Sequence, residues 1–134
     1  MGVRPVDQHL DCLSSLVRTS TLDTELGGCV NLALAKIDVE GAEALALAGF
    51  GRGLAAQNPP VIIIEAHDHS LRKMGSSKAE VFDVLEAAGY EPLAFDVNSG
   101  ALVPLDDGDG ADVIAVARRC RDAVDERLLP PRLL

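Results

Sequence analysis

The segment at residues 32–50, with the sequence LALAKIDVEGAEALALAGF, constrains the fold more than any other part of the chain. A short apolar run is followed by three acids and a glycine, and then by an Ala- and Leu-rich stretch. Such a run is typical of a strand buried on both faces, as in a parallel sheet. Because Gly41 permits a tight turn, the pattern predicts a strand, a turn and a helix in direct succession.

The three acids, Asp38, Glu40 and Glu43, fall where this strand ends and the helix begins. In open α/β sheets, ligands bind in the crevice beyond the carboxyl ends of the strands, so Asp38 and Glu40 are candidate functional residues. The alternative is that Glu40 and Glu43 only complement the positive N-terminus of the helix. Lys36 precedes Asp38 by two residues and is either part of the same site or its structural ion-pair partner.

A second apolar run, VIII at residues 61–64, is β-branched and predicts a central, buried strand. It leads into residues 65–69, EAHDH, and brings Glu65 and His67 to the same edge of the sheet as Asp38. Two histidines and two carboxylates in five residues suit a divalent ion or a general base, but also a polar loop. No second set of ligands has matching spacing, so we predict no metal site.

The other patterns extend this into an α/β fold. In chain order they predict a strand at 16–19, a helix starting at 21–26, a helix at 41–57 weakened by three glycines, a loop at 70–76, a helix begun by a capping box at 77–80, strands at 92–97 and 113–117, and a charged helical tail at 118–134. The Asp-rich residues 106–110 predict a solvated turn, because they lack the spacing of a calcium loop. The order indicates right-handed βαβ units closed by an antiparallel hairpin.

Length and charge limit the class of protein. With 134 residues the chain is predicted to form a single domain, and 48% hydrophobic residues are typical of a globular protein. The net charge of −9 argues against binding to nucleic acid or to an anionic membrane. Three widely spaced cysteines without a CxxC pair indicate neither a zinc site nor a disulfide framework. Without a signal peptide pattern or a membrane-spanning apolar run, we expect a cytoplasmic protein.

The residues at the first strand–helix junction also resemble a known family. Residues 36–43, KIDVEGAE, resemble the signature of FkbM-type S-adenosylmethionine-dependent methyltransferases. Supporting words occur in the same order at residues 21–23 (TLD), 61–65 (VIIIE) and 89–90 (GY). The resemblance extends over residues 16–117, which corresponds to the C-terminal half of such an enzyme. It implies part of a Rossmann-like class I methyltransferase sheet, mostly parallel, in which the last strand inserts antiparallel to form a C-terminal hairpin.

The resemblance also implies a function. We expect methyl transfer from S-adenosylmethionine to an oxygen of a sugar or another small metabolite, with Asp38 and then Glu40 as the candidate catalytic residues. Glu65 and His67 are candidates for binding the methyl acceptor. Nothing before residue 16 resembles the family's glycine-rich cofactor loop, so we assign no cofactor-binding residues and expect weak binding of the cofactor by this chain alone. The alternative is a non-catalytic α/β remnant or interaction module.

The first strand is expected to lie at an edge of the sheet. In the family it would pair with a strand of the cofactor half, which this chain does not show. An apolar edge with unpaired backbone groups tends to associate with other chains, so residues 32–38 predict self-association.

Overall fold

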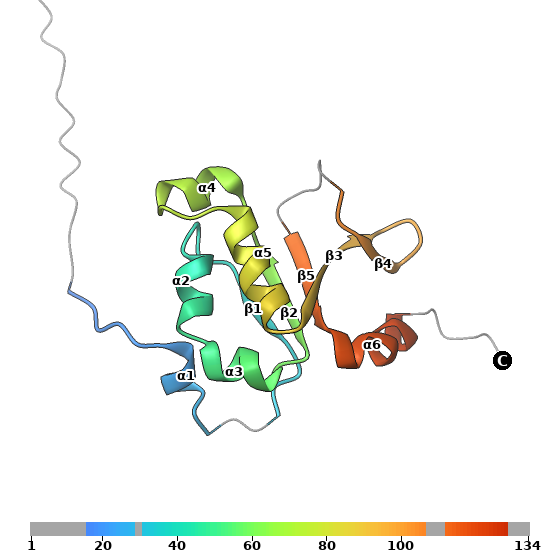
Figure 1. Cartoon of the computed structure of the whole chain (residues 1–134), viewed down its shortest axis with the longest axis horizontal. Coiled ribbons are helices and arrows are strands. Elements are labelled where there is room, and N and C mark those ends of the chain that lie inside the picture. The colour runs from blue at the N-terminus through green and yellow to red at the C-terminus, as the bar shows by residue number, and fades with distance from the viewer. Residues whose placement is uncertain (1–15, 29–30, 107–111, 129–134) are drawn as a thin grey trace, which may run out of the picture.

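The computed structural model describes residues 16–28, 31–106 and 112–128. Within these residues the chain is a mixed α/β protein with a five-stranded sheet in the order β1-β2-β5-β3-β4 (Figure 1). The elements are α1 (Leu22–Glu25), β1 (Ala35–Ile37), α2 (Glu43–Ala48), α3 (Gly51–Ala56), β2 (Val61–Glu65), α4 (Asp68–Lys73), α5 (Lys78–Ala87), β3 (Tyr90–Asp96), β4 (Ala101–Pro104), β5 (Asp112–Ala117), the 3-10 helix η1 (Arg118–Cys120) and α6 (Arg121–Leu128).

The direction of the strands corrects the prediction of a mostly parallel sheet. β1 and β2 are parallel, but β5 runs antiparallel to both β2 and β3, and β4 runs antiparallel to β3. The last strand therefore inserts antiparallel, as the resemblance implied, and it lies between β2 and β3. The sequence predicted that β3 would form a hairpin with β5. The structure contains a further strand between them, β4, and it is β4 that forms the hairpin with β3. Apolar runs indicate where strands lie but do not indicate their direction or neighbours.

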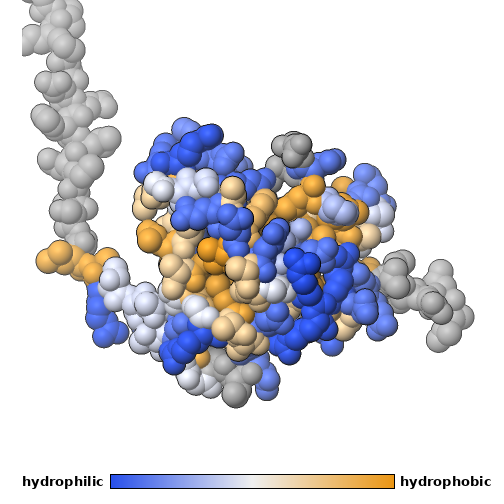
Figure 2. Space-filling view, viewed as in Figure 1, coloured by the Kyte–Doolittle hydropathy of each residue, from blue (hydrophilic) through white to orange (hydrophobic). Residues whose placement is uncertain are grey.

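Helices α2 to α5 lie over one face of the sheet (Figure 1). The main core lies between them and the sheet, and its largest members are Leu47, Phe50, Ile62, Ile64, Leu71, Leu85 and Tyr90. A smaller cluster joins Val124 of α6 to Leu93, Leu102 and Val116. Figure 2 shows hydrophilic residues gathered over α4 and along α6, with hydrophobic residues between them. Two clusters therefore hold the sheet, and the larger one supports the ends of β1 and β2.

The first strand is shorter than the apolar run predicted. β1 pairs with β2 only from Ala35 beside Ile62 to Ile37 beside Ile64. Pro59 and Pro60 precede β2 and have no N–H group with which to continue the ladder. The amide of Leu32 instead donates to the side chain of Asn58 at 2.9 Å. The strand predicted at residues 16–19 is absent from the structure, in which these residues are exposed and have no strand partner among the described residues.

The helix predicted at residues 41–57 is two helices. α2 ends at Ala48, and Phe50, which is buried in the core, turns the chain before α3 begins. The first amides of α3 are satisfied from elsewhere: the carboxylate of Asp23 accepts from the N–H groups of Arg52 at 2.8 Å and Gly53 at 3.1 Å. These hydrogen bonds lower the pKa of Asp23, with that of Arg52 as the main cause. Asp23 belongs to α1, whose predicted start after Thr21 is confirmed.

Residues 70–76, predicted as a loop, instead contain most of α4. Leu71 explains the difference, because its fully buried side chain anchors this short helix in the core. The next helix, α5, starts as predicted: the Ser77 hydroxyl accepts from the amide of Glu80 at 3.2 Å. The carboxylate of Glu80 does not complete the capping box and accepts from the hydroxyl of Ser76 at 2.8 Å.

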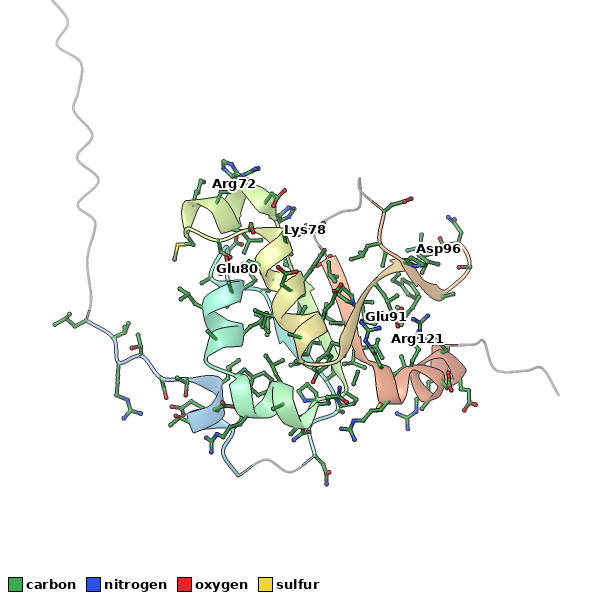
Figure 3. All side chains as sticks on the ribbon, in the orientation of Figure 1. Arg72, Lys78, Glu80, Glu91, Asp96 and Arg121 are labelled. Atoms are coloured by element: carbon green, nitrogen blue, oxygen red, sulfur yellow. The ribbon has the colours of Figure 1, made fainter. Side chains whose placement is uncertain are left out.

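The charged tail is helical where the structure describes it. In α6, Arg121 pairs with Glu91 of β3 at 2.9 Å and with Asp125 at 2.8 Å, so the helix is fixed to the sheet (Figure 3). Cys120 is a free, half-buried thiol. The other two cysteines, residues 107–110 of the predicted solvated turn and residues 129–134 of the tail lie outside the described residues. Over residues 16–28, 31–106 and 112–128, the structure has no helix that is long and apolar enough to span a membrane.

Candidate functional site

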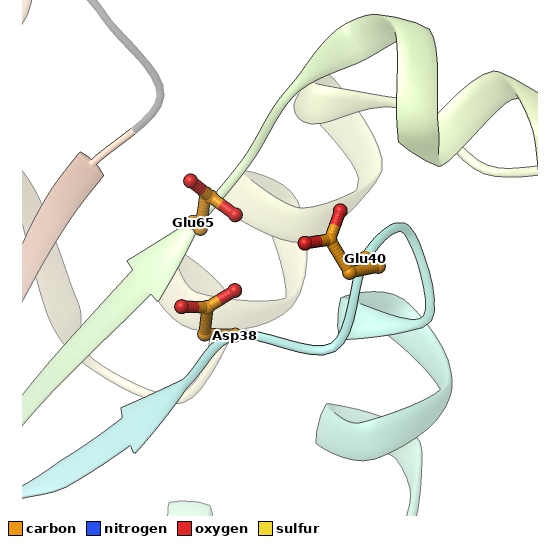
Figure 4. Close-up of side chains that lie close together, drawn as sticks. All are labelled: Asp38, Glu40 and Glu65. Atoms are coloured by element: carbon orange, nitrogen blue, oxygen red, sulfur yellow. The ribbon is translucent and has the colours of Figure 1, made fainter.

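Three carboxylates meet where β1 and β2 leave the sheet. Because Ile37 lies beside Ile64 in this parallel pair, the next residues, Asp38 and Glu65, leave at the same edge. This confirms the predicted placement of the two acids on neighbouring strands. Glu40 joins them from the turn after β1, and carboxylate oxygens of Asp38, Glu40 and Glu65 lie within 4.8 Å of one another (Figure 4).

Asp38 and Glu65 form a hydrogen-bonded carboxyl pair with opposite pKa shifts. The ammonium group of Lys36 lies 2.9 Å from Asp38 and is the main reason that the pKa of Asp38 is lowered, with the hydrogen bond to Glu65 as the second cause. The hydrogen bond to Asp38 is also the main reason that the pKa of Glu65 is raised, followed by its burial. Glu65 is therefore the weaker acid of the pair and Asp38 the stronger one. The ion pair proposed for Lys36 is confirmed.

The turn after β1 has an unusual backbone that directs Glu40 toward the pair. Glu40 has a φ of +53° and Gly41 a φ of +107°. A side chain at Gly41 would also collide with the backbone carbonyl of Ser70 in α4. Only glycine meets both conditions, which explains the glycine in this position.

Glu43, the third acid of the motif, is buried and plays a part that the sequence reasoning missed. Its Oε1 accepts from the amides of Val39 at 3.2 Å and Gly41 at 3.1 Å. These are the two amides on either side of Glu40. Glu43 is the first residue of α2, as the helix-terminus alternative requires, but its side chain turns back to the loop. The sequence signal for this role was the short spacing, because Glu43 follows Gly41 by two residues and Val39 by four.

The histidine segment contributes less than its composition suggests. His67 approaches the cluster, with its Nε2 3.5 Å from Oε1 of Glu65, and its side chain is 58% exposed. His69 is exposed on α4. Asp68 accepts from the amide of Lys78 at 3.4 Å and so connects α4 to α5. In the described part of the chain, the group of close acidic and histidine ligands therefore contains Glu65 but neither histidine.

The carboxylate cluster lies on an open edge. The Asp38 side chain is 38% exposed. A cavity of 170 Å³ lies elsewhere, between α1 and α3, and its lining includes Asp23, Phe50 and Arg52. A second of 530 Å³ is lined by residues that include Gln57, Pro60 and Arg119. Neither lining contains an acid of the cluster. Asp38 and Glu40 are exposed and Glu65 is half-buried, so the cluster is accessible to a ligand.

The described residues form a mixed α/β protein, and in open α/β sheets ligands bind beyond the carboxyl ends of the strands, which is where these acids lie. The family follows from a comparison with protein-family models. The model of the methyltransferase FkbM domain matches residues 15–92, more than half of the chain, and the chain belongs to this family. The match lies in the N-terminal part of the chain and ends within β3. The resemblance described from the sequence extends further, to residue 117. Neither the search of curated proteins nor that of solved structures produced a match.

Proposed function

We propose that this chain forms the acceptor side of an S-adenosylmethionine-dependent methyltransferase site that acts on a hydroxyl group of a sugar or another small metabolite. The observation that carries the proposal is the Asp38–Glu65 carboxyl pair at the ends of two neighbouring parallel strands. Membership of a methyltransferase family supports the reaction class. The acceptor and the cofactor are part of the proposal.

The pair divides the work between its two members. Asp38, kept ionised by Lys36, is the candidate general base and takes the proton of the acceptor hydroxyl as its oxygen becomes the nucleophile. Glu65 is the weaker acid of the pair, and in its protonated form it can donate a hydrogen bond to a second oxygen of the acceptor. Glu40 and His67 lie at the rim and can orient further hydroxyl groups. A molecule with several adjacent hydroxyls suits such a set, and this favours a sugar-like acceptor.

The described residues fit one end of the cofactor. Its sulfonium is positively charged and supplies an electrophilic methyl group when bound, so a cluster of carboxylates suits that end. The two cavities described above do not adjoin the cluster, and they therefore offer no enclosure for an adenosine group beside Asp38. On this basis we expect a dissociation constant on the order of 1 mM for the chain alone, since each missing buried hydrogen bond costs about 1–3 kcal/mol.

The second candidate is a non-catalytic interaction module of the same family. The open position of the acids favours it, because methyl transfer is normally shielded from water. It requires no cofactor contact at Asp38 or Glu65. The two functions therefore differ in what the carboxyl pair touches.

An NMR titration with S-adenosylmethionine up to millimolar concentration tests the proposal. We expect the shifted amides to lie at residues 38–41 and 65–67, and Asp38→Asn to weaken these shifts. Asp83→Asn is the matched control, because Asp83 is an exposed aspartate on α5. In parallel, transfer of a deuterated methyl group to a panel of sugars is followed by mass spectrometry, with Asp38→Asn expected to abolish it.

Two outcomes would reject the methyltransferase proposal. One is a titration in which the shifts fall elsewhere on the chain or are absent at saturating cofactor. The other is methyl transfer that Asp38→Asn and Asp83→Asn affect equally. Either would favour the interaction module.

A further inference from the structure

Glu43 is the buried charged residue of the described structure. It is 1% exposed, and only one of its carboxylate oxygens is used: Oε1 accepts the two amide hydrogen bonds of the turn, while Oε2 has no hydrogen-bond partner among the described residues. Burying a carboxylate costs free energy unless hydrogen bonds offset that cost, and here the two turn amides supply them. The described contacts of the Glu43 carboxylate therefore serve the turn at residues 39–41.

The two amides flank Glu40 and fix the turn in a conformation that it would not adopt by itself. Glu40 has a side chain but occupies the left-handed region, which is unfavourable for residues other than glycine, asparagine and aspartate. Two hydrogen bonds to a single oxygen constrain Val39 and Gly41 together. The constraint determines where the carboxylate of Glu40 lies relative to the Asp38–Glu65 pair.

We propose that Glu43 is a positioning residue: its buried carboxylate holds the turn at residues 39–41 and thereby keeps Glu40 beside Asp38 and Glu65. The inference rests on the proposed function only in treating these three acids as the acceptor site. It differs from a capping role, in which Glu43 would stabilise the start of α2 without affecting Glu40. Glu43 itself lies behind the turn and does not contact the acceptor.

Amide exchange and carboxyl NMR on the full chain distinguish the two roles. In Glu43→Ala, we expect the amides of Val39 and Gly41 to exchange about tenfold faster, the factor for losing one hydrogen bond. The pKa of Glu65, which is held up by its hydrogen bond to Asp38 first and by the charge of Glu40 as a smaller contribution, should move down as Glu40 departs. Asp38 and His67 also face Glu65, so their titrations are followed in the same spectra.

The conservative variant provides the rescue. Glu43→Gln keeps an Oε1 acceptor, so both amides should stay protected and the pKa of Glu65 should stay raised. Leu47→Ala is the matched control, because it removes a buried side chain from the same helix without touching the turn. It should loosen α2 and leave the turn amides and the pKa of Glu65 unchanged.

Three results would overturn the inference. The first is unprotected Val39 and Gly41 amides in the unaltered chain, a measurement that needs no variant to fold. The second is a Glu43→Ala protein with both amides protected and an unchanged pKa for Glu65, and the third is an equal change in Leu47→Ala. None of these measurements uses cofactor or acceptor, so failure of the methyl-transfer assay leaves them interpretable. Where transfer is observed, Glu43→Ala should lower kcat and Glu43→Gln should restore it.

Discussion

At the scale of single residues, the contacts of each acidic side chain determine its part in the site. Asp38, Glu40, Glu43 and Glu65 are four acids with four different environments. Asp38 is paired with an ammonium group, Glu65 has a raised pKa, Glu40 occupies a strained turn and Glu43 is buried beneath it. Their chemistry therefore follows from their contacts, although their residue types are nearly the same.

The raised pKa of Glu65 predicts a pH-dependent effect of Glu65→Gln. A raised pKa contributes stability below the usual value of 4.5, and this contribution is lost as pH rises through the higher value in the folded protein. Gln imitates the protonated form at every pH, since it can still donate to Asp38. Relative to the unaltered chain, Glu65→Gln should therefore gain stability as pH rises from below 4.5 through the higher pKa of Glu65 in the folded protein.

Urea unfolding at several pH values measures this difference. Glu86→Gln, an exposed glutamate on α5, is the control and should show no such trend. A difference in stability between Glu65→Gln and the unaltered chain that is constant over the whole pH range would contradict the raised pKa of Glu65.

At the scale of elements, several short helices begin where a side chain supplies the first hydrogen bond. α5 uses its own Ser77, but α3 uses Asp23 from a segment almost thirty positions earlier. Local caps are visible in the sequence, whereas a remote cap is created only by folding. This difference explains why α5 was predicted correctly and the start of α3 was not.

Replacing the local cap tests its contribution. Ser77→Ala removes the acceptor for the amide of Glu80 and should lower the free energy of unfolding by about 0.5–2 kcal/mol. Ser76→Ala is the control, because that hydroxyl contacts the exposed carboxylate of Glu80 and caps no backbone group. Thermal or urea unfolding gives both values, and equal effects of the two substitutions would argue against a specific cap.

At the scale of the whole molecule, the sheet has an open side at β1. β1 pairs with β2 on one side and lies at the edge of the described sheet. Leu34 beside it is 49% exposed, and Val39 on the following turn is 44% exposed. Unpaired strand groups flanked by apolar side chains favour association with another chain, here a second copy.

We therefore predict concentration-dependent self-association, measured by sedimentation velocity. Leu34→Lys should reduce it, because a charged side chain at an edge strand opposes pairing. Val97→Lys is the control: Val97 is 80% exposed but lies at the β3–β4 turn, far along the sheet from β1. A monomer at every concentration, or equal effects of both lysines, would refute association through this edge.

The sequence by itself determined the features that depend on neighbouring residues. The buried strand β2, the capped start of α5 and the placement of Asp38 and Glu65 at one edge all follow from short-range patterns, and the KIDVEGAE motif identified the family. Tertiary structure decided the rest. The prolines before β2 shortened β1, and burial of Leu71 and Phe50 created α4 and divided the helix after the motif. Pairing across the sheet placed β5 between β2 and β3 and made β4 the hairpin partner of β3. Each of these depends on groups brought together from distant parts of the chain, which no local pattern records.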